Sequence, residues 1–229
     1  MANPTIEELH NPAEFELIAE LEHPHIKSFV LDQLAKGGKL VTVFMIYQIV
    51  MMTLGINKIK VEFKDTKGMI IDIRNYPSAF VPFSLETFFS ADGNPFVKFS
   101  KLNWLTPGEF SFTQTLNIPA STEPYKGKLM VLVNDISQSQ AEYTAMAFRA
   151  GDNTTIIGST TAGADGNVSS IMLPGGLRTM ISGIGVYYPD GTETQRVGIV
   201  PDVEVLPTVK GIKDGRDELL EKAIQLINE

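Results

Sequence analysis

The sequence contains no cysteine. Disulfide bonds and thiolate metal sites are therefore excluded, and cysteine usage says nothing about the cellular compartment. Histidine is also rare: His10, His23 and His25 are the three in the chain, and all lie in its first 25 residues. A histidine base for a later nucleophile would have to come from this segment or from another chain. His23 and His25 resemble half a metal site, but no third ligand stands near them, so we expect neither a metal nor any other cofactor.

Positive charge is scarce as well. Lysine and arginine number 19 against 27 aspartates and glutamates, giving a net charge of −8. No basic cluster is present, which argues against a nucleic-acid partner. The acidic N-terminus lacks the basic and apolar regions of a signal peptide, so none is expected in this chain and the compartment stays undetermined.

Long apolar runs are limited to one stretch. Residues 40–56 carry no formal charge over 17 positions, which is at the lower edge of what spans a bilayer. Polar residues dilute the stretch and β-branched residues gather in its first half. We therefore expect a buried strand leading into a core helix and no membrane span.

The segment from residue 128 to residue 151 organises the rest of the chain. Residues 129–133 form an unbroken apolar run that predicts a strand buried on both faces. A polar turn follows, and apolar residues at helical spacing begin after Ser139 and end before Gly151, a predicted C-cap. Ser139 therefore stands where a strand passes into a helix, beside amide groups that favour negative charge. Two interpretations stay open: Ser139 is a nucleophile, or Ser137 or Ser139 is only a helix N-cap.

The flanking regions predict an α/β fold. Residues 1–36 show helical spacing, and residues 69–74 and 154–158 read as further buried strands. Residues 79–125 predict a long irregular excursion, with room for a small hairpin. We expect an N-terminal appendage over residues 1–65 and a core over residues 66–229.

Three more expectations concern details of the core. Asp72 and Arg74, in an otherwise apolar strand, should be hydrogen-bonded at its end. An antiparallel hairpin is expected from residue 173 to residue 197, with a turn at residues 188–191. Residues 200–205 read as an edge segment, and the chain should close with an amphipathic helix capped by Asp214.

Four blocks in this order resemble the C-terminal processing peptidase family, which also includes the tricorn protease core and interphotoreceptor retinoid-binding protein. They are residues 67–77, 128–142, 156–168 and 186–205. The resemblance implies a ClpP/crotonase-like α/β core, with parallel-type strands flanked by helices, plus the hairpin and the small N-terminal helical piece. It also implies serine endopeptidase activity on a peptide or protein substrate. Members of the family are often exported to the cell envelope.

Carried over by position, the resemblance makes Ser139 the nucleophile, with Glu142 three residues further on. The oxyanion would be bound by the backbone N–H of Gln140 and by that of Ser78, because Pro77 has no N–H. The family has Gly-Gly where this chain has Ser78 and Ala79, a departure that restricts the backbone at the second donor.

The general base is the main departure from the family pattern. Ala164 stands where bacterial members have a lysine, in a loop with Gly163, Asp165 and Gly166 that we expect to line the substrate site. Asp165 could act only through a relay. Glu193 and Gln195 fall near the place of the late acid in the tricorn branch.

The base would then come from a missing N-terminal module, from a partner in a homo-oligomer, or from the N-terminal histidines of this chain. The alternative is an inactive module of the same fold that binds a peptide or an apolar ligand.

Overall fold

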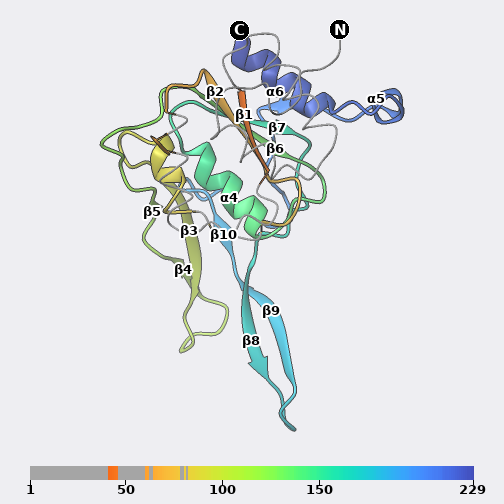
Figure 1. Ribbon diagram of the computed structural model, residues 1–229. Helices are drawn as coiled ribbons and strands as arrows, with labels where there is room; N and C mark the ends of the chain where they lie inside the picture. Colours follow the sequence, from red (N-terminus) through yellow and green to blue (C-terminus); the bar gives the residue numbers. More distant parts are fainter. Residues whose placement is uncertain (1–40, 46–59, 62–63, 78–79, 81) are drawn as a thin grey trace, which may run out of the picture.

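The computed structural model describes residues 41–45, 60–61, 64–77, 80 and 82–229. The predicted N-terminal helices, the three histidines and Ser78 lie outside these residues. Figure 1 shows a body built around a sheet, from which hairpins project.

The body is organised around a five-stranded sheet in which every neighbouring pair is parallel. Its order is β1 (Val41–Met45), β2 (Gly68–Asp72), β6 (Lys128–Val133), β7 (Thr154–Gly158) and β11 (Val203–Glu204). The three predicted buried strands are β2, β6 and β7, and the predicted edge segment contains β11 at one edge of the sheet. The α/β fold class is therefore confirmed.

Helices cover both faces of this sheet. α4 (Gln140–Arg149) packs on one face and α6 (Glu218–Asn228) on the other. Alternate strand residues point to opposite faces, so the apolar runs of β2 and β6 supply both cores. On the α4 face, β2 and β6 contribute Met69, Ile71, Leu129, Val131 and Val133 to the core. On the α6 face they contribute Ile70, Met130 and Leu132.

The predicted excursion over residues 79–125 contains more structure than expected. It holds the 3-10 helix η2 (Glu86–Phe89) and the strands β3 (Pro95–Leu102), β4 (Phe110–Phe112) and β5 (Leu116–Asn117). β3 pairs antiparallel with both β4 and β5, and its other edge pairs with β10 (Val186–Tyr187). The predicted small hairpin is β3–β4.

The predicted hairpin of residues 173–197 was placed too late in the chain. β8 (Asn167–Met172) pairs antiparallel with β9 (Arg178–Ile184) instead. The reason is the turn between them, where Gly175 and Gly176 both have positive φ, a conformation that glycine adopts without strain. The predicted turn at residues 188–191 is present as a separate, smaller feature, closed by the Gly191 N–H donating to the Tyr188 carbonyl at 2.9 Å.

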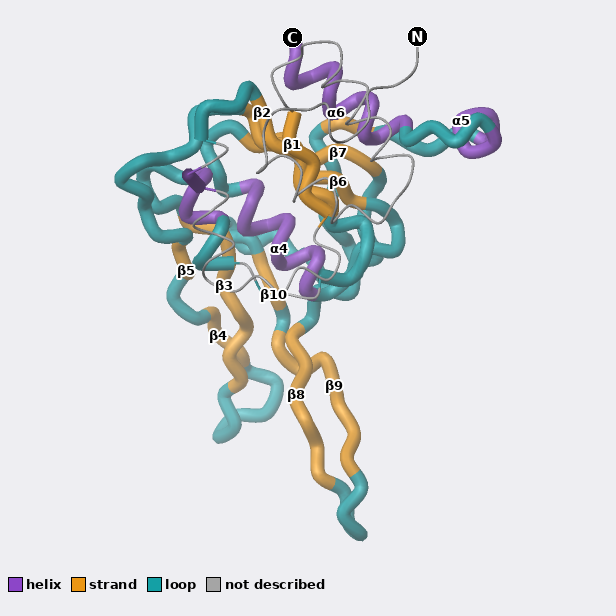
Figure 2. Tube along the Cα trace, viewed as in Figure 1, coloured by secondary structure: helices purple, strands orange, loops and turns teal. Residues whose placement is uncertain are grey.

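We call residues 167–184 the β8–β9 arm, because the hairpin extends away from the body (Figure 2). Its only charged side chain is that of Arg178. Large apolar side chains on both of its faces and at its tip are exposed, namely Val168, Ile171, Met172, Leu173, Leu177, Met180 and Ile181.

The closing helix begins later than predicted. Asp217 is the N-cap of α6, and its side chain accepts a hydrogen bond from the Leu220 N–H at 3.0 Å. Asp214, the predicted cap, is the C-cap of the short helix α5 (Val209–Lys213). The chain therefore has two short helices where one was expected. Asp214 ends the first of them, and Asp217 begins the second.

Residues 41–45 form a strand, as expected for the start of the apolar stretch, and the rest of that stretch lies outside the described residues. No helix in the described part of the chain is long and apolar enough to cross a bilayer. The division at residue 65 stays a prediction; β1, from the first part, extends the sheet of the second.

Candidate active site

The candidate site lies at the carboxyl edge of the parallel sheet. The loops that leave β2, β6 and β7 meet there, because neighbouring parallel strands end on the same side. The loop after β6 ends at Ser139, and the loop after β7 contains residues 159–166. Sites in open α/β sheets form at this edge.

Ser139 has an unusual backbone conformation. Its φ is 51° and its ψ is −115°, close to the first central residue of a type II′ turn, a position dominated by glycine. An ordinary N-cap residue is extended instead. Holding a serine in such a conformation costs on the order of 1–3 kcal/mol, and strain of this kind gathers at functional sites.

Ser137 holds the turn before Ser139 in place through hydrogen bonds to two neighbouring loops. Its side chain is 1 % exposed, and its hydroxyl lies 3.1 Å from the Ile73 carbonyl at the end of β2. Its own carbonyl accepts the Ala162 N–H at 3.0 Å. Ser137 therefore ties together all three loops, whereas Ser139 is only half buried.

Glu142 connects the turn at Ser139 to the loop after β7. Its carboxylate, with 0 % exposure, accepts the Ser139 N–H at 2.9 Å and the Thr161 hydroxyl at 2.5 Å. It also accepts the N–H groups of Gly163 at 2.7 Å and Ala164 at 2.9 Å. Four donors thus satisfy both oxygens of a buried carboxylate, the arrangement that such a group needs.

Thr161 extends this network to the C-terminal part of the chain. While its hydroxyl donates to Glu142, its oxygen accepts the Ile199 N–H at 2.7 Å. We call Ser139, Glu142, Thr161, Gly163 and Ala164 the carboxylate clasp. It joins α4, the loop after β7 and the segment that leads to β11.

The glycines of the predicted substrate loop allow close backbone approach. Gly163 has φ 68°, and a Cβ there would lie 3.0 Å from the backbone of Arg196, whose N–H donates to the Gly163 carbonyl at 2.6 Å. A Cβ on Gly166 would lie 2.6 Å from Nε2 of Gln195. The side chain of Gln195 therefore lies against this loop.

Asp165 points inward from the same loop. It is 4 % exposed, and Oδ2 lies 3.1 Å from the hydroxyl oxygen of Thr194. Burial, reinforced by the negative charge of Glu142, raises the pKa of Asp165 to about 8, although the contact with Thr194 lowers it. Asp165 is thus a poor proton acceptor at neutral pH.

The other predicted site residues described by the structure are Glu193, Gln195 and Gln140. Glu193 pairs with the exposed Arg196 at 2.8 Å. Thr194, between Glu193 and Gln195, is the residue that faces inward. Gln140 is the first residue of α4, directly after Ser139.

Three residues of the site were not singled out for these roles from sequence. Thr161 and Thr194 are small polar residues whose carboxylate partners, Glu142 and Asp165, lie at least 19 positions away, so no local pattern reveals these contacts. Glu142 did carry a signal, because it stands three residues after a predicted N-cap, the spacing of a capping box.

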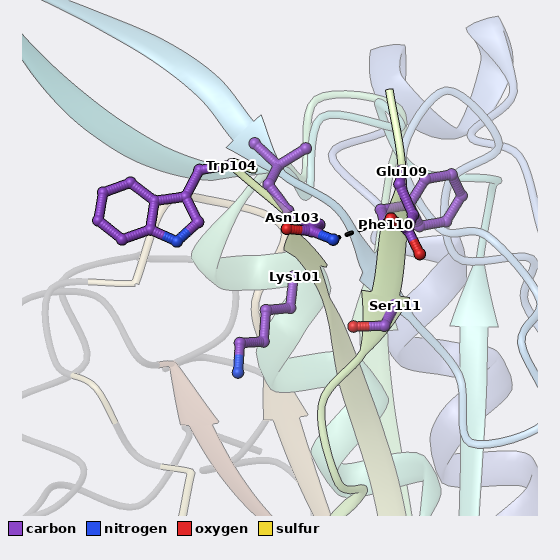
Figure 3. Close-up of a pocket in the computed structure, with 7 residues that line it drawn as sticks. Lys101, Asn103, Trp104, Glu109, Phe110 and Ser111 are labelled. Carbon is purple, nitrogen blue, oxygen red and sulfur yellow. Dashed lines mark hydrogen bonds between the residues drawn. The ribbon is translucent and has the colours of Figure 1, made fainter. Parts of the chain in front are cut away.

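The structure also has a pocket of about 340 Å³ away from Ser139, on the β3–β4 hairpin (Figure 3). Its walls belong to the hairpin itself, and Trp104 is 91 % exposed. The lining residues are Lys101, Leu102, Asn103, Trp104, Glu109, Phe110 and Ser111. Within the described residues, no three histidines or acids gather closely enough to hold a metal ion.

Residues 7–205 match the model of peptidase family S41. Among solved structures, a presumed peptidase from Parabacteroides merdae ATCC 43184 is 24% identical with a TM-score of 0.67, over 79% of this chain and 58% of that one. Mature CPAF is 17% identical with a TM-score of 0.64, over 81% and 50%. The tricorn protease is 20% identical with a TM-score of 0.58, over 88% and 19%. This chain therefore spans less than two thirds of each, and no curated protein sequence matches it.

Proposed function

This chain belongs to peptidase family S41, and from that premise we propose that it is the core of a serine endopeptidase with Ser139 as its nucleophile. The substrate would be an extended peptide segment lying against the carboxyl edge of the sheet. The loop of residues 163–166 would form one wall of its binding site.

The backbone of Ser139 is the observation that carries this proposal. Ser139 is the N-cap of α4 and forms a capping box with Glu142, but capping normally works from an extended backbone and does not account for φ 51°. A strained turn between a strand and a helix instead presents a hydroxyl toward incoming substrate. The carboxylate clasp supplies the contacts that hold this turn.

The chemistry follows from that placement. The Ser139 oxygen attacks the scissile carbonyl carbon, its proton passes to a base, and the carbonyl oxygen becomes an oxyanion. The backbone N–H of Gln140 would donate to that oxyanion, together with that of Ser78. One such donor contributes about 3 kcal/mol to lowering the barrier. Collapse of the intermediate releases the amine product and leaves an acyl-enzyme, which water then hydrolyses.

The base is proposed to be a histidine from outside the described residues. It would come from the N-terminal segment of this chain, from a preceding module, or from a neighbouring copy in a homo-oligomer. Asp165 does not fit the role, because its raised pKa keeps it protonated at neutral pH.

A serine-directed fluorophosphonate tests the proposal. The expected result is covalent labelling of the wild-type chain, with mass spectrometry placing the adduct on Ser139, and no labelling of Ser139→Ala. Ser170→Ala, which removes an exposed hydroxyl from β8, is the matched control and should label normally. Absence of labelling in the wild-type chain, with excess imidazole supplied as an external base, would count against the nucleophile.

A second candidate function is peptide binding, without catalysis, on the same surface. The observation in its favour is Ala164, which stands where bacterial members of the family have a lysine and whose N–H is held by Glu142. This candidate requires peptide binding by calorimetry that Ser139→Ala leaves unchanged, in a protein that the fluorophosphonate does not label.

A further inference from the structure

The β8–β9 arm presents the backbone of β8 along one of its two outer edges. Within the described residues the arm is a sheet of two strands, in which β8 pairs with β9 alone. The N–H and C=O groups on the far side of each strand can therefore pair with a further strand. The arm extends from the body, so this edge is accessible along its length (Figure 2).

The register of the arm shows which residues of β8 direct their backbone outward. At the tip, the Leu173 N–H donates to the Leu177 carbonyl at 2.8 Å, so the backbone of Leu173 faces β9. Backbone groups in an antiparallel ladder alternate between facing the partner strand and facing away from it. Val168, Ser170 and Met172 therefore direct their N–H and C=O groups away from β9, and their side chains share one face.

The outer edge of β8 lacks the usual protection against pairing. Natural edge strands commonly carry a charged residue or a proline. β8 contains neither, and its one irregularity of register lies at its base, between Asn167 and Val168. On β9 the residue opposite Met172 is Arg178, which places a charge on that other edge. The edge of β8 is thus the better one for a further strand.

The residues along this edge match a second copy of themselves. Their order is apolar, serine, apolar, which reads the same in both directions. Antiparallel pairing about Ser170 would place Val168 opposite the partner's Met172 and Ser170 opposite the partner's Ser170. Both are favourable cross-strand pairs, and no charged residues face each other across this edge.

We propose that two copies of this chain associate through their arms, with β8 of one copy pairing antiparallel with β8 of the other about Ser170. The product is a four-stranded sheet, whereas two strands alone are at best marginally stable in water. Because the contact is two-fold symmetric and occupies the β8 edge of both copies, it closes at a dimer. The exposed tip of each arm, with Leu173 and Leu177, then lies at the base of the other arm.

A lipid bilayer is the other environment that accepts exposed apolar side chains. Hydrocarbon offers no partner to the outward N–H and C=O groups of β8, and open strand edges do not occur in it. A second β8 supplies a partner for each of them. The backbone of the arm therefore favours a protein strand over lipid.

The size of the arm sets the strength of the contact. Residues 167–184 provide 18 residues, close to the lower end of the roughly 20–30 that each partner contributes to a standard interface. We therefore expect a dimer that dissociates at about 10 µM, so that the bodies are separate in dilute solution.

Sedimentation equilibrium of the wild-type chain gives the first test. Its mass should rise from that of one copy toward that of two between about 1 and 200 µM. Ser170→Pro removes an outward N–H and leaves the ladder with β9 intact, so it should weaken association about 10-fold or more. Ser182→Pro, which removes an outward N–H from β9, is the matched control and should associate within about twofold of wild type.

The second test examines the register, because only Ser170 is placed opposite itself. Ser170→Lys and Ser170→Glu should each weaken association about 10-fold, since each sets like charges opposite one another. An equimolar mixture of the two variants should regain the wild-type mass. Ser182→Lys and Ser182→Glu are the matched controls and should associate like wild type, whether alone or mixed.

Three outcomes would overturn the proposal. One is a wild-type chain that stays monomeric at 200 µM, and another is a mixture of Ser170→Lys and Ser170→Glu that fails to associate. The third is a monomer that floats with phosphatidylcholine vesicles and loses this binding with Met172→Ser and Met180→Ser, which would make lipid the partner. None of these measurements uses the proposed activity, so they stand apart from the assignment of Ser139.

Discussion

At the scale of single residues, the site depends on one strained serine and one buried carboxylate. Ser139 adopts a backbone that serine disfavours, and Glu142 binds the N–H of that same residue together with three donors from the facing loop. The strain has to be offset by contacts that exist only in the folded molecule. Most of these contacts end on Glu142.

Glu142→Gln should therefore lower the stability of the fold and displace Ser139, the proposed nucleophile. The amide would direct N–H groups at backbone N–H groups, leaving buried donors without acceptors. We expect a loss of about 3 kcal/mol in the free energy of unfolding, measured with urea. The rate of fluorophosphonate labelling should fall about 100-fold, because a small displacement of a nucleophile has a large effect on rate.

The control for this variant is Glu123→Gln, at an exposed position away from the clasp. It should change the free energy of unfolding by less than about 0.5 kcal/mol. If Glu142→Gln behaves like this control in both measurements, the carboxylate does not hold the turn.

At the scale of elements, the end of β2 is joined to the start of α6. Arg74 binds Asp72 at 2.6 Å and Asp217 at 2.6 Å, and the side chains of this trio are 25 % exposed or less. Asp217 also caps α6 through the Leu220 N–H. The polar residues of an apolar strand are thus paired at its end, as the sequence predicts.

Asp217→Ala should destabilise the protein by about 2 kcal/mol, because it removes a helix cap and one partner of Arg74 together. Asp214→Ala is the matched control. Asp214 forms an exposed pair with Lys210, which contributes less than about 0.5 kcal/mol. Urea unfolding of both variants measures whether Asp217→Ala loses more stability than Asp214→Ala. Equal losses would mean that Asp217 does not act as the cap of α6.

The elements that could be predicted from sequence are those whose signal is local. β6 and α4 follow from an apolar run and a helical spacing that burial on the sheet imposes. The β8–β9 hairpin was misplaced because strands with exposed apolar residues have no clear alternation to fix their register. The role of Thr161 depends on contacts with Glu142 and Ile199, which come together only when the chain has folded.

At the scale of the whole molecule, the body and the β8–β9 arm differ in how they are stabilised. The body has two apolar clusters, one on each face of the sheet. The arm has two strands that expose apolar side chains on both of its faces. An isolated two-stranded hairpin is at best marginally stable in water. The arm therefore adds little to the stability of the body.

Replacing residues 168–183 by an Asn-Gly turn tests this separation, since Asn167 and Ile184 are paired across the base of the arm. We expect the midpoint of thermal unfolding to shift by no more than about 3 °C. Val97→Thr, in the core and 0 % exposed, is the comparison and should lower the midpoint by more. A drop of about 10 °C on removal of the arm would mean that the arm belongs to the folding unit.

The span of the carboxylate clasp has a consequence for protein synthesis. Its contacts run from Ser139 through Glu142 and Thr161 to Ile199, so 60 residues separate its first member from its last anchor. The chain must therefore be synthesised beyond residue 199 before all of these contacts can hold Ser139 in its backbone conformation. Under the function proposed above, the nascent polypeptide therefore has no activated hydroxyl until that point in its synthesis.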